Sequence, residues 1–97
     1  MTAESGGGIV RMRIIYTGRV QGVCFRAISQ ELAQRRRVVG WVRNVPDGTV
    51  ELETEGTPDE VEAFLASIAQ QFSRNITHAD RTSLPARLDE SRFSVRY

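Results

Sequence analysis

The residues best placed to do chemistry lie between Gly18 and Arg26, in the stretch Gly-Arg-Val-Gln-Gly-Val-Cys-Phe-Arg. Glycines can take positive φ and let a ligand approach the main chain closely. Successive backbone N–H groups can then turn inward as an anion-binding nest, and the helix expected to follow would add the positive end of its dipole. Arg26 offers a planar fork for two phosphoryl or carboxylate oxygens. The stretch therefore predicts an oxyanion cradle, with phosphate as the ligand.

Composition limits the chemistry open to this cradle. The chain has 97 residues and a formal net charge of +1, from 13 Lys+Arg against 12 Asp+Glu. These values favour one globular domain and argue against a strongly basic nucleic-acid binder. The chain has one cysteine, Cys24, and one histidine, His78. They are too few for an internal disulfide, a usual zinc site or a Ser-His-Asp triad, which argues against a His- or Cys-based metal site.

The N-terminal residues and the hydropathy pattern predict where the protein works. No apolar run approaches the roughly 18 residues that a membrane span needs. Residues 1–8 have neither the basic nor the apolar region of a signal peptide, and their Ser-Gly-Gly-Gly segment is typical of a flexible tail. We therefore expect a cytoplasmic protein without membrane contact, with a tail at 1–8 and a single domain at 9–97.

Hydrophobic periodicity predicts the elements that flank the cradle. Apolar residues alternate from Val10 to Tyr16, which predicts a strand with one buried face. From about Val23 to Arg36 the apolar spacing is helical, so the cradle would open an amphipathic helix. The β-branched and aromatic run at 38–42 then predicts a second strand.

A hairpin is expected next. The turn residues at 45–48, Val-Pro-Asp-Gly, supply proline for the first central position and glycine where φ is positive. Residues 49–55 alternate cleanly and form the returning strand. Its acidic face, made by Glu51, Glu53 and Glu55, is expected to be the solvent side of the sheet.

The second half of the chain repeats the helix-then-strand pattern. Thr57 as N-cap, Pro58 at the first helical position and Glu60 in a capping box predict a helix that runs to about Phe72. We expect a short edge strand at 77–84 after this helix, then a loop at 85–90 and a closing strand at 92–97.

This order of elements is β-α-β-β-α-β. Right-handed crossovers would place both helices on one face of an antiparallel sheet, which is the ferredoxin-like α+β sandwich. In that topology the first two strands run parallel to each other. The end of the first strand, next to the cradle, and the end of the second, at Asn44, would therefore lie at the same edge of the sheet.

Two blocks of sequence together resemble the acylphosphatase family. Residues 18–26 read G-x-V-Q-G-V-x-F-R, and residues 40–51 read G-W-V-R-N-x-x-D-G-x-V-E, with a later glycine at Gly56. Both signatures occur in the family's order and at its spacing. The resemblance covers roughly Val10 to Tyr97, nearly the whole chain apart from the tail.

The resemblance implies hydrolysis of small-molecule acyl phosphates to a carboxylate and inorganic phosphate, without metal or cofactor. It implies two catalytic residues, Arg26 to hold the phosphoryl group and Asn44 to orient the attacking water. Inorganic phosphate would bind as product and inhibitor, and a monomer is the expected state. The phosphate would also be bound by the loop backbone, at Arg19, Val20, Gln21, Gly22, Val23, Cys24 and Phe25.

Each of the polar candidates also has a structural interpretation. Arg26 could form a surface ion pair, and Asn44 could simply start the hairpin turn, because asparagine favours turns. Gln21 is expected to be a hydrogen bonder within the loop more than a ligand. For Cys24, a thiol activated by the helix N-terminus competes with a small buried hydrophobe, and we expect burial.

Three further residues are expected to be structural. Trp41 is interpreted as packing, not as a stacking platform, and His78 as a surface residue on the edge strand. Arg37 stands where the family commonly has the glycine that ends the first helix. An arginine there would cost on the order of 1 kcal/mol if the backbone needs positive φ.

Two other functions compete with hydrolysis. A domain of this fold could bind phosphate or another anion without catalysis, as a regulatory module. A ferredoxin-like sheet could also bind RNA, but that use needs exposed aromatic residues and a basic face. The glutamates of the strand at 49–55 argue against RNA.

Overall fold

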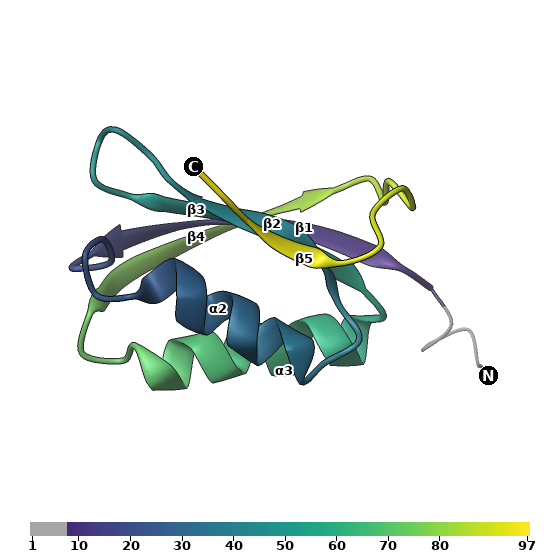
Figure 1. Ribbon diagram of the computed structural model, residues 1–97. Coiled ribbons are helices and arrows are strands. Elements are labelled where there is room, and N and C mark those ends of the chain that lie inside the picture. The colour runs from purple at the N-terminus through teal and green to yellow at the C-terminus, as the bar shows by residue number, and fades with distance from the viewer. Residues whose placement is uncertain (1–7) are drawn as a thin grey trace.

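The computed structural model describes residues 8–97. The expected tail at 1–8 lies, except for Gly8, outside these described residues. Seven elements follow one another in the described part of the chain (Figure 1). They are β1 (Val10–Gly18), α2 (Phe25–Gln34), β2 (Val39–Asn44), β3 (Val50–Gly56), α3 (Pro58–Gln71), β4 (Ile76–Leu84) and β5 (Phe93–Arg96).

The strands form one sheet in the order β4-β1-β3-β2-β5. Strand β3 pairs antiparallel with both β1 and β2, and β4 pairs antiparallel with β1. Both helices cover the same face of the sheet (Figure 1). The predicted ferredoxin-like α+β fold is confirmed. The sheet is mixed because β5 lies parallel to β2, and the expected short edge strand is the nine-residue β4.

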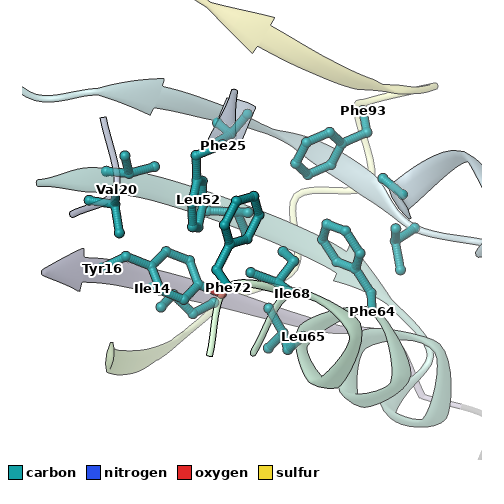
Figure 2. Packing of buried hydrophobic residues seen from close by; sticks show 14 of the residues in the cluster. Ile14, Tyr16, Val20, Phe25, Leu52, Phe64, Leu65, Ile68, Phe72 and Phe93 are labelled. Atoms are coloured by element: carbon teal, nitrogen blue, oxygen red, sulfur yellow. The ribbon is translucent and has the colours of Figure 1, made fainter. Parts of the chain in front are cut away.

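The hydrophobic core fills the space between the sheet and the helices and combines aliphatic side chains with several aromatic rings in mutual contact (Figure 2). The ring of Phe25 stacks on Phe72, with 4.4 Å between centroids, and also lies 5.1 Å from Tyr16. Phe64 meets Phe93 edge-on at 5.3 Å. Because Phe25 is the first residue of α2, this packing fixes the start of that helix, beside the predicted cradle.

The opposite face of the sheet differs from the prediction. Glu51 and Glu55 were expected to face solvent, yet they are only 6% and 3% exposed. Both carboxylates lie in ion pairs with arginines of the neighbouring strand β1, Glu51 with Arg13 at 2.8 Å and Glu55 with Arg11 at 3.0 Å. Alternation along β3 shows which residues share a face, but it cannot show that arginines on β1 and a later loop cover that face.

Arg11 is the centre of this ionic layer. Its side chain is fully buried and also contacts Glu53 at 2.7 Å and Glu90 at 2.8 Å. Burial by itself lowers the pKa of Arg11, but hydrogen bonds to Glu90, Glu53 and Glu55 raise that pKa above its usual value. Arg11 is therefore a charged residue held in the interior by its partners.

The structure tests the predictions for two helix ends, the start of α3 and the residues that follow α2. Thr57 caps α3 by accepting the backbone N–H of Glu60 at 3.4 Å. The other half of the predicted capping box is not formed in the described residues, because the Glu60 carboxylate accepts the backbone N–H of Arg37 at 3.0 Å and not that of Thr57. Arg37 is not among the positive-φ residues of 8–97, so arginine in place of the family's glycine carries no left-handed strain.

Candidate active site

The loop between β1 and α2 and the hairpin between β2 and β3 lie at the same end of the sheet (Figure 1). Strands β1 and β2 run in the same direction because each is antiparallel to β3. They end at Gly18 and Asn44. Arg26 and Asn44 line one cavity of about 250 Å³, together with Gly22 and Cys24 of the loop.

The loop backbone has the shape of an anion-binding nest. Gly22 has φ 76°, and Cys24 is in the left-handed region with φ 63° and ψ 26°. Within residues 8–97, the backbone N–H groups of residues 20–24 donate to no backbone carbonyl. The first N–H groups of α2 also lack partners inside the helix. The N–H groups of residues 20–24 are therefore without a backbone partner in the described chain, and the space beside Gly22 is open, since an added Cβ there would meet no atom within 4 Å.

Cys24 is not the small buried residue that we expected. Its side chain is exposed and lines the cavity. The expectation treated the loop as if it alternated like a strand, but the loop is bent throughout. The buried side chains are Val20 and Phe25, on either side of the bend. A left-handed backbone costs a residue with a Cβ about 1–2 kcal/mol, so Cys24 stores strain at the cavity wall.

Arg19 is tied to a distant part of the chain. Its N–H donates to the carbonyl of Asn75 at 2.9 Å, and the Asn75 side-chain amide returns a hydrogen bond to the Arg19 carbonyl at 3.1 Å. The Arg19 N–H is therefore engaged, and the free donors begin at Val20. Sequence inspection missed Asn75, because no local pattern announces a contact across 56 positions.

Gln21 links the loop to the hairpin. Its side-chain amide donates to the carbonyls of Val45 and Thr49, each at 2.8 Å. This confirms the expectation that Gln21 is a structural hydrogen bonder. The hairpin itself is shaped by Asp47, which accepts the N–H of Thr49 at 3.0 Å and its hydroxyl at 2.7 Å. The hydroxyl hydrogen bond, with the backbone one, lowers the pKa of Asp47.

Arg26 is held by the end of the chain. Its Nη1 donates to the carbonyl of Arg96 at 3.2 Å, and its guanidinium carbon lies 4.6 Å from the centroid of the Tyr97 ring. Within residues 8–97 Arg26 contacts no carboxylate, which removes the surface ion pair as an explanation. Tyr97 was not among the residues predicted for the site, although its place beside the cavity makes it part of the wall.

The remaining candidates lie outside the cavity. Trp41 is buried, and the guanidinium of Arg96 lies 4.5 Å from its ring centroid, as packing predicts. His78 is a surface residue of edge strand β4. In the described part of the chain, no group of three or more His, Cys, Asp or Glu side chains is placed to hold a metal ion. None of the helices in that part is long and apolar enough to cross a membrane.

Comparison with known proteins identifies the family. The sequence profile of acylphosphatase matches residues 12–95. The chain belongs to the acylphosphatase family. Acylphosphatases are hydrolases of an acid anhydride bond, and their substrates are small-molecule acyl phosphates. The family therefore makes this chain a hydrolase of that class, as the two signature blocks predicted.

Individual relatives agree with the profile. An acylphosphatase of Geobacillus thermodenitrificans is 39% identical over 88 residues, which cover 90% of this chain and 94% of that protein. Acylphosphatase-2 of Gallus gallus is 41% identical over 85 residues, 82% of each chain. The crystal structure of acylphosphatase from Bacillus subtilis superposes with a TM-score of 0.83 at 37% identity and covers 91% of this chain and 99% of that one.

Proposed function

We propose that the protein hydrolyses the carboxyl–phosphate bond of acyl phosphates with Arg26 and Asn44 as its catalytic pair. The observation that supports this most directly is that both side chains line one cavity, beside a loop whose N–H donors are free. The proposal extends the family's activity to named residues of this chain. Residues 9–97 would form the catalytic domain.

Phosphate binding is assigned to the loop and Arg26. The free N–H groups from Val20 to Cys24, with the N-terminus of α2, would surround the phosphoryl oxygens. Arg26 would complete the cradle with bidentate hydrogen bonds to two phosphoryl oxygens. These hydrogen bonds strengthen as charge develops on the oxygens in the transition state. Because Arg96 and Tyr97 already hold its guanidinium, little reorganisation is needed when substrate binds.

The role assigned to Asn44 is to orient the attacking water molecule. From the end of β2, its amide would orient a water molecule for in-line attack on phosphorus. The water oxygen forms the new P–O bond as the bond between phosphorus and the acyl oxygen breaks. The acyl phosphate dianion and water thus give a carboxylate and dihydrogen phosphate, with the water proton passing to phosphoryl oxygen. A carboxylate leaves readily, so positioning and charge stabilisation supply the catalysis.

The decisive experiment compares three forms of the protein in hydrolysis of benzoyl phosphate with EDTA present. We expect Arg26→Ala and Asn44→Ala to fold normally by circular dichroism and to lose at least about 100-fold in kcat. Inhibition by inorganic phosphate should weaken much more in Arg26→Ala than in Asn44→Ala. Arg35→Ala is the matched control, since Arg35 is an exposed arginine next to α2 that does not line the cavity.

The outcomes separate catalysis from binding. Full activity in either variant would remove the role assigned to that residue. Wild-type protein that binds phosphate but does not hydrolyse benzoyl phosphate would instead support a non-catalytic anion-binding module of the same fold.

The compartment, the oligomeric state and the ligands of the enzyme can be proposed as well. We assign it to the cytoplasm as a monomer that acts without metal or nucleic acid and is inhibited by its product phosphate. The free, exposed thiol of Cys24 is compatible with a reducing compartment, where thiols persist without oxidation to disulfides. Light scattering with chromatography would measure the mass of the particle and test the monomer.

A further inference from the structure

A second groove continues from the candidate active site. It has a volume of about 640 Å³ and runs between the C-terminal half of α2 and strand β5. Gln30, Val95 and Tyr97 line both this groove and the active-site cavity, so the two spaces adjoin along β5. Gln30 also donates to the carbonyl of Phe93 at 3.3 Å and fixes the distance between helix and strand at the junction. A ligand seated against Arg26 can therefore extend into the groove.

The lining of the groove is partly apolar and partly positively charged. Ala33, Val38 and Phe93, which line it, are buried apolar residues that suit a hydrocarbon chain. Two arginines, Arg36 and Arg92, also line it, and no Asp or Glu does.

These two arginines differ from those on the other face of the sheet. There Arg11, Arg13 and Arg43 each contact a carboxylate. Within residues 8–97, neither Arg36 nor Arg92 forms an ion pair. Two exposed guanidinium groups that share a groove without a carboxylate favour an anionic ligand group between them.

We propose that this groove binds the acyl part of the substrate and that Arg36 and Arg92 recognise a second oxyanion at its far end. The inference rests on the proposed function, because it takes the phosphoryl group to be held at Arg26. The substrate class is then an acyl monophosphate whose chain ends in a carboxylate or phosphate. Simple acyl phosphates remain substrates but lack the distal contact.

The spacing of the arginines sets the length of the preferred chain. Arg26 and Gln34 are about 12 Å apart along α2, and Arg36 lies two residues beyond the end of that helix. Arg92 precedes Arg96 by four positions, about 13 Å along a strand. A four-carbon diacid is too short to reach from the phosphoryl site to these cations. A ten-carbon diacid, with the arginine side chains folded inward, spans the groove.

The test measures kcat/KM for matched pairs of substrates on the wild-type protein. Sebacoyl monophosphate is compared with decanoyl phosphate, and succinyl monophosphate with butyryl phosphate. We expect the long diacid to be preferred over its partner by about three- to tenfold, as two exposed ionic contacts allow. The short diacid should show no such preference. A phosphonate-terminated analogue of the ten-carbon chain distinguishes a carboxylate from a phosphate as the distal group.

Two double variants identify the residues. Arg36→Gln/Arg92→Gln should abolish the preference for the long diacid and leave kcat/KM for decanoyl and benzoyl phosphate unchanged. Arg35→Gln/Arg74→Gln removes the same charge from exposed arginines that do not line the groove, and it should keep the preference. High salt should reduce the preference in the wild type, because exposed ionic contacts are screened.

The results decide between this inference and the function on which it rests. Hydrolysis of benzoyl phosphate without any preference for the long diacid would overturn the groove and leave the catalytic pair intact. An equal preference in the short and long pairs, or equal losses in the two double variants, would also overturn it. Failure to hydrolyse benzoyl phosphate would overturn the proposed function itself.

Discussion

Cys24 shows how a single residue can shape the site through its backbone. It lies at the N-cap of α2 with φ 63°, and its side chain makes no capping hydrogen bond. A left-handed residue at this position bends the chain, and such a bend is one of the backbone conformations from which anion-binding nests are built. Its thiol is exposed at the cavity wall. The contribution of Cys24 to phosphate binding is therefore expected to come from its backbone conformation.

Substitution by residues with different tolerance for positive φ tests this role. Cys24→Val should lower the free energy of unfolding by about 1–2 kcal/mol, because a β-branched side chain fits the left-handed region poorly. Inhibition by phosphate should weaken in the same variant. Cys24→Asn is the control, since asparagine enters this region several-fold more often than most residues. Equal losses in urea titrations of the two variants would contradict a conformational role.

The roles proposed for single residues differ in how far sequence can predict them. The common location of Arg26 and Asn44 at one cavity is predictable, because each adjoins local turn chemistry and the element order alone brings the two strand ends together. The exposure of Cys24 is not predictable from hydrophobic pattern, since a bent loop has no period. The hold of Arg96 and Tyr97 on Arg26 depends on where β5 pairs, about 70 positions away.

At the scale of elements, the junction of β1 with β4 sets the position of the phosphate loop. The register of this pair shifts between Thr17 and Gly18, as in a β-bulge. Gly18 has φ 128°, and a Cβ there would collide with the carbonyl oxygen of Asn75. The bulge turns the chain out of the sheet directly into the loop.

Two glycine substitutions separate close packing from backbone strain. Gly18→Ala should lower the free energy of unfolding by about 2–4 kcal/mol, because the methyl group must displace the β4 backbone. Gly22→Ala adds a methyl group in open space at φ 76° and should cost only about 1 kcal/mol. Chemical denaturation of both variants gives the two values. A smaller loss for Gly18→Ala than for Gly22→Ala would refute the close contact with Asn75.

The elements were predictable to different degrees for physical reasons. Helix α3 carries its start signals in sequence, and its predicted cap at Thr57 agrees with the structure. Strand β4 gives a weak signal because it is an edge strand with mostly exposed side chains. Such a strand is specified by its partner β1 more than by its own pattern.

At the scale of the whole molecule, the two faces of the sheet are held in different ways. Hydrocarbon packs between the sheet and the helices (Figure 2), whereas the other face carries an ionic layer. In that layer Glu55 accepts the N–H groups of Arg87 and Leu88, at 2.8 Å and 2.9 Å, as well as Arg11. Glu55 thus connects the centre of the sheet to the loop before β5, the strand that carries Arg96 to the active site.

This layer predicts how stability depends on pH. Burial alone would raise the pKa of Glu55, but hydrogen bonds from Arg87, Leu88 and Arg11 lower it overall. The unfolded chain therefore binds a proton at higher pH than the folded protein does. The stability that Glu55 contributes is present above the unfolded pKa of about 4.3 and is lost as pH falls through the lower folded pKa.

The Glu55→Gln variant tests this pH dependence when its free energy of unfolding is measured against pH beside that of the wild type. At neutral pH the variant should lose about 1–3 kcal/mol, since the buried Arg11 keeps two other carboxylates. Its stability should fall less steeply than that of the wild type below about pH 4.3. Glu62→Gln, which removes an exposed partner of Arg81, should cost at most about 1 kcal/mol. Parallel acid profiles for wild type and Glu55→Gln would contradict the assignment.

The link between Arg19 and Asn75 has a consequence for how fast the enzyme becomes active. The two residues are 56 positions apart, and β1 meets β4 across still longer separations. Contacts of such range close late, because a long loop of chain must lose its entropy first. The phosphate cradle is a short segment of sequence, yet its first residue is fixed by hydrogen bonds to Asn75, 56 positions away. We therefore expect activity to recover during refolding at the rate at which β4 assembles on β1, after the helices have formed.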